Sequence, residues 1–452
     1  MTPDQNHSKP PQDARRVRTR DVWIIAAPLM ISNVSVPLLG IVDTAVVGQL
    51  PGSQNIGAVA VGALIINLIY WMFGFLRMGT GGFTAQALGS NDHTEVRAIF
   101  GRATIAAISV GLLIVVLQWP LTIAALAIVQ PSADVYDLSQ SYVSIRIWGA
   151  PAVLANFVIL GWLLGLQKTK SVLLLQVYMN GTNMVLDALF VLKFGWGVEG
   201  VAIATLIAEV SALGIGLWMV RSQAAKLSGK WDMSRIKDWA RVRVLMSLNR
   251  DLFIRTLCLE ATFVAFTAVG ARMGDDILAA NAVLLLFLSF VSYALDGFAD
   301  AANTLVGSAL GAGSHSQFWQ SVQITTLWAA LFSAGFTAIF FAAGSDIVNL
   351  ISIEPTVRET ASLYLKYVIV LPVIAIWSYE LDGIFIGATR GPDIRNAMLI
   401  ATVGYFLLVW LLVPRYGNDG LWFALLGLFV LRAVTLAVRL PAINRSLSTS
   451  PQ

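Results

Sequence analysis

The chain alternates between long apolar stretches and short polar ones from end to end. Apolar runs of about 18 or more residues are long enough to cross a bilayer as helices. The connections between them carry Gly, Pro, Asn and Asp, as turns do. The pattern predicts twelve membrane-spanning helices, at residues 21–48, 56–88, 97–120, 138–166, 171–193, 198–221, 244–272, 277–310, 317–343, 358–389, 394–414 and 419–440.

Composition agrees with a polytopic membrane protein rather than a soluble protein with an anchor. Of the 452 residues, 57% are hydrophobic and 12% are charged, whereas an ordinary soluble domain is about a quarter charged. The net charge of +4 is small and the basic residues cluster in predicted loops, so we expect no nucleic-acid partner. A single cysteine, Cys258, excludes a disulfide within the chain.

Lys and Arg are concentrated in alternate connections, which predicts the orientation in the membrane. They occur in the N-terminal tail (1–20), after the fourth helix, in a long connector (222–243), after the tenth helix and in the C-terminal tail (441–452). The loops 49–55 and 121–137 on the opposite side have none. We therefore expect both tails and the connector to be cytoplasmic, and the polar, Pro-rich first tail to be disordered.

The two halves of the chain align when the sequence is shifted by 222 residues. The motif Ala-Leu-Gly at 87–89 then meets the same motif at 309–311, and the match continues without a gap across several helices. Because each half holds an even number of helices, the copies share one orientation and relate by a pseudo-two-fold axis along the membrane normal. We predict an all-α protein with an N-lobe at 21–221 and a C-lobe at 244–440.

The fifth predicted helix carries a polar stripe. Gln176, Asn180, Asn183 and Asp187 recur at i, i+4, i+7 and i+11, which places them on one helix face. Charged groups in hydrocarbon are costly, so such a face is expected to avoid lipid and to line a cavity.

Depth in the membrane connects this stripe to two other helices. Asp43, Asp187 and Thr205 all lie roughly 8–11 Å below the outer helix ends, at 1.5 Å per residue. Asp43, Asn183, Asp187 and Thr205 are therefore predicted to meet in the outer half of the N-lobe and, with Asn180 of the stripe, to form a cation-coupling site. Carboxylate, amide and hydroxyl oxygens suit a small hard cation such as Na⁺, and two adjacent carboxylates also suit proton uptake.

Simpler interpretations remain open for several of these residues. Asp43 could be a carboxylate near a helix end that reaches interfacial water, and Thr205 could bond back to its own helix. Pro28 and Pro37 interrupt the helix that carries Asp43. They indicate either a mobile element or a static bend.

The second half does not repeat these acids, because Ala265 and Val409 stand opposite Asp43 and Asp187 in the alignment. Its own polar residues, together with Gln176, are predicted to line a central cavity or to form a second cation site: Glu260, Asp296, Asp300, Asn303 and Asp382. Polar packing between helices is the alternative for Glu260 and Asp382. We expect Arg77 to be an interfacial or structural charge and Arg255 to pair with Asp251 four residues earlier.

Five stretches resemble the multidrug and toxic compound extrusion (MATE) transporters, and within them the DNA-damage-inducible F (DinF) subfamily. They are PLLGIVDTAVVGQL (37–50), FLRMGTGGFTAQALG (75–89), LGWLLGLQ (160–167), ALDGFADAA (294–302) and LDGIFIGATR (381–390). The resemblance extends over essentially all twelve helices. Three positions depart from the subfamily pattern: Asn303 stands where Glu is common, and Asp300 and Glu260 are acidic.

The resemblance implies a V-shaped pair of lobes around a central cleft, and export of lipophilic, often cationic compounds driven by inward flow of H⁺ or Na⁺. It also implies that Asp43 is the central coupling residue of an N-lobe cation site and that Pro28 is the bending proline. Glu260 and Asp382 resemble the C-lobe acids of NorM-type relatives.

We therefore predict a cation-coupled multidrug antiporter, with H⁺ favoured and Na⁺ as the alternative. We expect a monomer in a bacterial inner membrane, with no enzymatic activity and no cofactor, since nucleotide-binding, metal-ligand and catalytic-triad patterns are missing. The nearest rival is a flippase for a lipid-linked or amphipathic substrate, which mostly acidic mid-span residues disfavour for an anionic lipid. An intramembrane enzyme would need His or Cys beside acids at membrane depth, and a receptor or channel fits a duplicated lobe less well.

Overall fold

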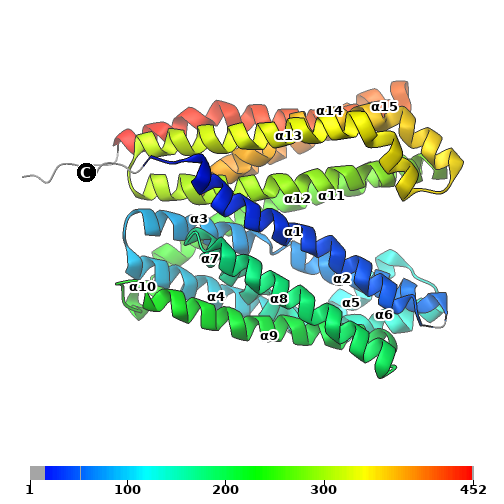
Figure 1. The fold of residues 1–452 in the computed structure, drawn as a ribbon, viewed down its shortest axis with the longest axis horizontal. Coiled ribbons are helices and arrows are strands. Elements are labelled where there is room, and N and C mark those ends of the chain that lie inside the picture. The colour runs from blue at the N-terminus through cyan, green and yellow to red at the C-terminus, as the bar shows by residue number, and fades with distance from the viewer. Residues whose placement is uncertain (1–15, 51, 450–452) are drawn as a thin grey trace, which may run out of the picture.

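The computed structural model describes residues 16–50 and 52–449, and every element in that part of the chain is a helix (Figure 1). The first half forms α1 (Thr19–Val47), α2 (Ser53–Trp71), α3 (Phe75–Gly89), α4 (His93–Val116), α5 (Gln118–Val129), α6 (Ala133–Arg146), the 3₁₀ turn η1 (Ile147–Gly149), α7 (Ala150–Gly165), α8 (Thr169–Asp187), the π-helical segment η2 (Ala188–Lys193) and α9 (Gly197–Ala225). The short α10 (Met233–Ile236) lies in the connector. The second half forms α11 (Trp239–Ala271), α12 (Asp275–Gly311), α13 (His315–Ile351), α14 (Pro355–Gly387) and α15 (Gly391–Thr449).

The number of spans agrees with the prediction. Nine stretches of the described chain are long and apolar enough to cross a membrane. The last of them, 391–443, contains two helices that meet at Gly417, where the backbone φ is 55°. With that division, and with α1 and α8, the described residues form the twelve spans expected. Helices suit this environment because lipid offers no partners to backbone N–H and C=O groups.

Several predicted boundaries were wrong. The helices expected at 56–88 and 138–166 are each divided, the first near Gly74 and the second by η1. The helix α4 begins four residues earlier than expected because the Asp92 side chain accepts a hydrogen bond from the Glu95 N–H (3.0 Å) and caps it. Residues expected in a loop form α5. An apolar run gives no signal of where a buried helix bends or divides.

The predictions for the two terminal tails compare differently with the structure. Residues 1–15, which make up most of the tail predicted to be disordered (1–20), lie outside the described residues, and α1 begins at Thr19. The C-terminal tail at 441–452 was not expected to be helical, yet α15 continues through it to Thr449.

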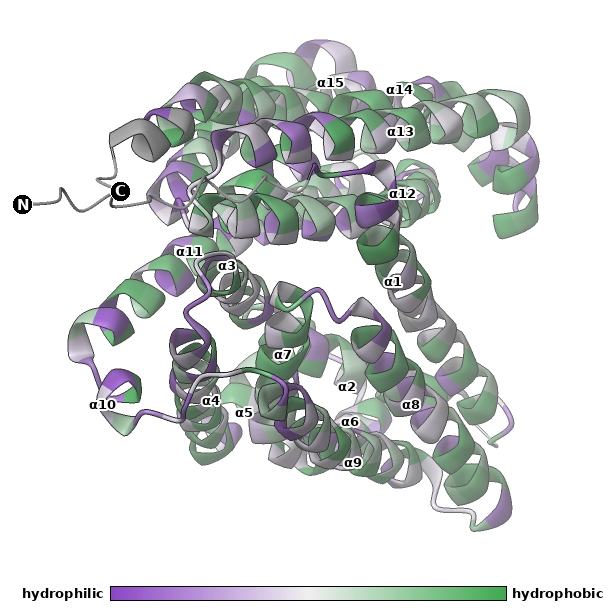
Figure 2. Ribbon diagram, turned by 60° about the vertical axis from the view of Figure 1, so that its left-hand side comes forward, coloured by the Kyte–Doolittle hydropathy of each residue, from purple (hydrophilic) through white to green (hydrophobic). Residues whose placement is uncertain are grey.

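The helices form two bundles, one for each half of the sequence (Figures 1 and 2). The helices α1 to α9 pack with one another, as do α11 to α15, and α3 and α1 meet α12 between the bundles. Figure 2 shows apolar helices with polar residues gathered mainly at their ends and in the connections. The predicted N-lobe and C-lobe therefore correspond to separate bundles.

The internal repeat is visible in the contact between the lobes. A Cβ on Gly89 would overlap the backbone carbonyl oxygen of Ser308, and a Cβ on Gly311 would overlap that of Gln86. A shift of 222 residues converts each contact into the other. The helices α3 and α12 thus touch backbone to backbone at their last residues, as small residues allow. The lobes are closed at this end.

The helix α1 belongs to the N-lobe in sequence, but its first half packs on the C-lobe (Figure 1). Trp23 packs edge-on against Phe298 and Trp328, with ring centroids 5.6 and 5.2 Å apart. Ten residues further along, the Asn33 side chain donates a hydrogen bond to the Tyr293 carbonyl oxygen (3.1 Å). The helix α1 also packs on α8 of the N-lobe, so it contacts both lobes.

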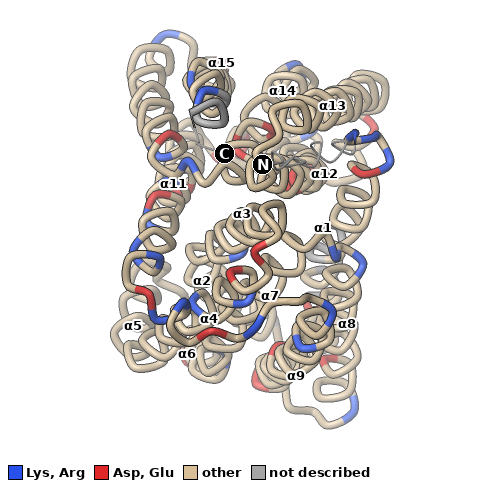
Figure 3. Tube along the Cα trace, turned by 90° about the vertical axis from the view of Figure 1, so that its left-hand side faces the viewer, with Lys and Arg blue, Asp and Glu red and all other residues tan. Residues whose placement is uncertain are grey.

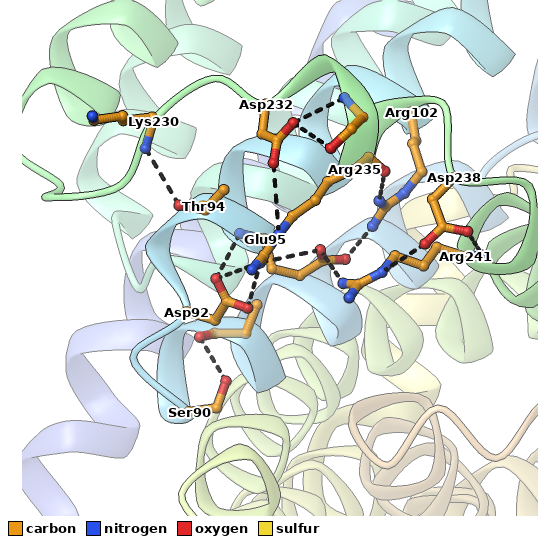
Figure 4. A network of polar contacts seen from close by, with 12 residues as sticks. Ser90, Asp92, Thr94, Glu95, Arg102, Lys230, Asp232, Arg235, Asp238 and Arg241 are labelled. Atoms are coloured by element: carbon orange, nitrogen blue, oxygen red, sulfur yellow. Dashed lines mark hydrogen bonds and ion pairs between the residues drawn. The ribbon is translucent and has the colours of Figure 1, made fainter.

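The charged connector is fixed to the N-lobe by a network of ion pairs (Figure 4). Arg235 donates two hydrogen bonds to the Asp92 carboxylate, at 2.7 and 2.8 Å, and Glu95 pairs with Arg102 and Arg241. Burial alone raises the pKa of Asp92, but the Glu95 N–H and the Arg235 guanidinium hold that pKa below its usual value. Because Arg241 begins α11, the network also connects the two lobes at their closed end.

We predict that Gly311→Ala destabilises the protein, because the new methyl group meets a backbone carbonyl that cannot move aside. Overpacking of this kind costs roughly 1–3 kcal/mol. The matched control is Gly335→Ala in α13, where a Cβ has nothing within 4 Å and helix propensity improves by about 1 kcal/mol. Thermal unfolding of the purified proteins in detergent measures both, and a Gly311→Ala protein as stable as the control would contradict the close contact.

Candidate functional site

The polar stripe of α8 faces α1 and forms a seam with it. The Ser32 hydroxyl donates a hydrogen bond to the Gln176 side chain, and Asn180 donates one to the Ser35 hydroxyl (2.7 Å). The sequence predicted that this stripe lines a cavity. Instead, the first two positions of the stripe find partners in the hydroxyl groups of α1, so the costly polar groups are satisfied inside the protein.

Pro28 takes part in the same seam. Proline has no N–H, so the carbonyl oxygen four residues earlier, that of Ile24, loses its helical partner. The Thr169 hydroxyl at the start of α8 donates a hydrogen bond to this oxygen (2.8 Å). The weak point of α1 is therefore tied directly to α8.

Asp43 and Asp187 lie together further along the seam. Their carboxyl groups interact directly, and Asp187 is fully buried. Neither oxygen of Asp187 has a hydrogen-bond partner of good geometry, and one oxygen of Asp43 also lacks one. A fully buried carboxyl group and a partly buried one thus face one another with unused oxygen atoms.

Asn183 and Thr205 lie next to this pair. The Asn183 side chain donates a hydrogen bond to the Thr205 hydroxyl (2.8 Å), which donates one to the Val201 carbonyl oxygen of its own helix (2.9 Å). The Asn183 carbonyl oxygen Oδ1 is buried and has no partner. Since Asn183 and Asp187 are one turn apart on α8, the structure brings together the four residues that depth and periodicity grouped.

The backbone changes form at this point. The α-helical part of α8 ends at Asp187 and continues as the π-helical segment η2. Single π-helical turns are rare and are frequent at functional sites. Nothing in the sequence signals this one.

Arg146 and Glu209 form a buried ion pair beside the carboxyl groups. Arg146 was not among the site residues predicted from the sequence. Its guanidinium donates two hydrogen bonds to the Glu209 carboxylate, at 2.5 and 2.9 Å. Both residues are less than one-tenth exposed, and Arg146 lies within electrostatic range of Asp43 and Asp187. A lone arginine in an apolar stretch was the available signal.

A second group of charges lies where the lobes meet. A small cavity of about 50 Å³ is lined by residues of α3, α11, α12 and α14: Arg77, Met78, Arg255, Asp296, Ala299, Asp300, Asn303, Tyr379, Asp382, Gly383 and Ile386. Four of the polar residues predicted to line a central cavity are in this set. Gln176 and Glu260 are not, because Gln176 bonds to Ser32 and Glu260 is half-buried near Arg255.

The arginines in this group are paired differently from what the sequence suggested. Arg255 was expected to pair with Asp251 but donates instead to Asp382, at 3.1 and 2.6 Å. Asp251 is bound by Arg250 and Arg395. Spacing of four residues within one helix could not reveal a partner on another helix.

Arg77 and Arg432 complete the group. Arg77 pairs with Asp300 across the lobe boundary, which agrees with the structural rather than the interfacial alternative. Arg432, which is buried, pairs with Asp382 and was missed by the sequence analysis. Arg77 and Arg255 line the cavity beside Asp296, Asp300 and Asp382, and Arg432 pairs with Asp382 from outside the lining. The charged lining residues are therefore mostly acidic, as the sequence indicated, but Asp300 and Asp382 are each paired with an arginine.

The two lobes match a known family model and known proteins. Residues 28–189 and 252–413 each match the family model described as MatE. The chain is 40% identical over 417 residues to DNA damage-inducible protein F of Escherichia coli (strain K12), covering 92% of this chain and 90% of the relative. It is 24% identical over 440 residues to human multidrug and toxin extrusion protein 1, covering 93% of this chain and 74% of the relative.

Solved structures show the same fold. A crystal structure of MATE in complex with MaD3S superimposes with a TM-score of 0.86 at 18% identity, covering 96% of this chain and 97% of the other. An outward-facing conformation of a multidrug resistance MATE family transporter gives a TM-score of 0.86 at 17% identity, with the same coverage. The matches to the family model in both halves, the 40% identity and the shared two-lobed fold together show that the chain belongs to the MATE family of multidrug efflux transporters, which are membrane transporters and not enzymes.

Proposed function

We propose that this protein is a cation-coupled antiporter that exports lipophilic, often cationic compounds by alternating access, with H⁺ as the coupling ion. The observation that carries the proposal is the Asp43–Asp187 pair inside the N-lobe, with its unused oxygen atoms. The proposed membrane is the bacterial inner membrane, with both termini cytoplasmic and the protein monomeric. The closed end between α3 and α12 is then cytoplasmic, which describes an outward-facing state.

The charge of the N-lobe cluster supports coupling to a cation. Arg146 is occupied by the bidentate pair with Glu209, so its charge is already compensated. If Asp43 and Asp187 were both ionised, the four groups would carry a net charge of about −2 in a medium of low dielectric, where like charges repel strongly. Binding of one proton or one small cation removes much of that repulsion.

The donor set favours H⁺ over Na⁺. A hard cation is bound by several oxygen ligands. Here Asp43, Asp187 and Asn183 offer unused oxygens, but the Thr205 hydroxyl already accepts one hydrogen bond and donates another. In the described part of the chain, no cluster of three or more His, Cys, Asp or Glu residues is arranged for a metal ion. A proton needs only one carboxyl oxygen, so the available oxygens are sufficient for H⁺. Na⁺ remains the alternative.

The seam between α1 and α8 supports a route from ion binding to movement. Asp43 lies on α1, and the seam joins that helix to α8 through Ser32, Ser35 and the Ile24 carbonyl. Neutralising the carboxyl pair changes the attraction between the two helices where they meet. Pro28 interrupts the hydrogen bonding of α1 and supplies a place for the helix to bend.

The central cavity bears on the choice of substrate. Asp296 lies in the field of Arg77 and Arg255 but, unlike Asp300 and Asp382, is not itself in an ion pair. It is the carboxylate that a cationic substrate would meet. A flippase for a lipid-linked or amphipathic substrate stays the alternative, because Arg77 and Arg255 also line the cavity and would meet an anionic head group there.

We predict that Asp43→Asn and Asp187→Asn each abolish ion-coupled export while leaving the fold intact, because each removes a carboxyl group from the coupling pair. Proteoliposomes with a pH gradient alone, or a Na⁺ gradient alone, would be assayed for uptake of a fluorescent cationic compound. Asp346→Asn is the matched control, since Asp346 is exposed and far along α13.

Unchanged export by Asp43→Asn would contradict its role in coupling. Activity with a Na⁺ gradient and none with a pH gradient would show that Na⁺ rather than H⁺ is the coupling ion. The proposed site would stay the same. Transfer of a labelled lipid between leaflets, without export of the cationic compound, would favour the flippase.

We also predict that Glu209→Gln weakens binding of the coupling ion. The substitution keeps the shape of the side chain but leaves the Arg146 charge uncompensated next to the carboxyl pair. The pair would then be partly neutralised by Arg146, and the ion concentration for half-maximal transport would rise about tenfold or more, which corresponds to ~1.4 kcal/mol. The concentration dependence of transport measures this, and an unchanged value would show that Arg146 does not influence the pair.

A further inference from the structure

A cavity lies at the closed end of the N-lobe, between α4 and the last turns of α9, apart from the groups described above. Its volume is about 470 Å³, and its lining residues are Arg97, Phe100, Leu217, Val220, Arg221, Ala224, Ala225 and Trp231. Figure 3 looks along the helices onto the end where this cavity lies. The transport mechanism makes no use of this cavity.

Two arginines give the cavity a positive charge. Arg97 is 6% exposed, and its Nη2 donates hydrogen bonds to the carbonyl oxygens of Ala224 (2.5 Å) and Leu227 (3.1 Å). Its Nε is buried without a partner. Arg221 is exposed and makes no hydrogen bond or ion pair within the part of the chain that the structure describes.

Among the described residues, the lining of this cavity holds two arginines and no carboxylate. The nearby acids of the connector network are occupied, Glu95 by Arg102 and Arg241 and Asp92 by Arg235 (Figure 4). The positive charge of Arg97 and Arg221 is therefore not balanced by a carboxylate in the cavity, and an anion would be bound favourably there.

The rest of the cavity is apolar and runs toward the bilayer. Leu217 precedes the end of α9 by about two turns, or roughly 12 Å at 1.5 Å per residue. Trp231 is 52% exposed and packs edge-on against Phe100, with ring centroids 6.3 Å apart. A tryptophan at the polar end and apolar side chains below it match the order of head group and acyl chain in a leaflet.

We propose that this cavity binds an anionic phospholipid of the cytoplasmic leaflet, with its phosphate between Arg97 and Arg221 and an acyl chain along Leu217 and Phe100. The leaflet follows from the orientation proposed above. Guanidinium groups suit phosphate because they present several donors in a plane, and basic pockets between helices on this side bind anionic head groups. Because Arg97 also holds the carbonyl groups where α9 becomes the connector, the lipid stabilises this junction.

The full-length protein in detergent provides the test. Phosphatidylglycerol, phosphatidylcholine with the same acyl chains, or glycerol 3-phosphate is titrated in, and the shift in the unfolding temperature gives an affinity. We expect saturable stabilisation by phosphatidylglycerol alone. Arg221→Gln should weaken it about tenfold, because a charge-assisted hydrogen bond is lost. Arg439→Gln, at an exposed arginine on the same side of the membrane, should leave it unchanged.

A second variant tests the acyl-chain wall without changing the charges. Leu217→Gln, at a half-exposed position, should also weaken phosphatidylglycerol binding. Equal stabilisation by phosphatidylcholine, or an unchanged affinity in Arg221→Gln, would overturn the proposal. Stabilisation by glycerol 3-phosphate at the same concentrations would overturn it too, because the site would then bind a soluble anion.

Discussion

The structure depends on one constraint, that a charge in the bilayer must find its partner within the protein. Arg146 meets Glu209, Arg77 meets Asp300, and Asp382 meets two arginines. These pairs are buried ions whose separation would be costly, so they hold the helices that carry them in place. Against this background the Asp43–Asp187 pair is distinct, because its two members have the same sign and unused oxygens. This pair is where the proposed coupling ion would bind.

Duplication explains the scaffold but not the chemistry. The glycine contacts at Gly89 and Gly311 are copies of one another, and they bring α3 and α12 together at equivalent points. The acids are not copied, since Ala265 and Val409 stand where Asp43 and Asp187 would recur. A symmetric frame thus carries an asymmetric charge distribution. The like-charged pair Asp43–Asp187 is in the N-lobe. The ion pair of Asp300 lies at the boundary between the lobes, and the ion pairs of Asp382 lie in the C-lobe.

The sequence was sufficient for features that follow from periodicity and was insufficient for features that depend on packing. Twelve spans, two lobes and the grouping of Asp43 with Asn183, Asp187 and Thr205 follow from apolar length, repeat spacing and helix geometry. The partners of Arg255 and Arg432 did not follow, because a charge pair between distant helices leaves no trace in local spacing. The same holds for the π-helical turn after Asp187 and for the break at Gly417.

The helix α1 joins these parts of the structure. Near its start, Trp23 packs among aromatic rings of the C-lobe, while Asp43 near its end lies against Asp187 in the N-lobe. A helix held at both ends by different lobes cannot follow one lobe without bending or releasing the other. Pro28 removes a hydrogen bond between these two attachments, and Thr169 on α8 takes up the freed carbonyl. A change in charge at Asp43 therefore acts on a helix whose position is set by both lobes.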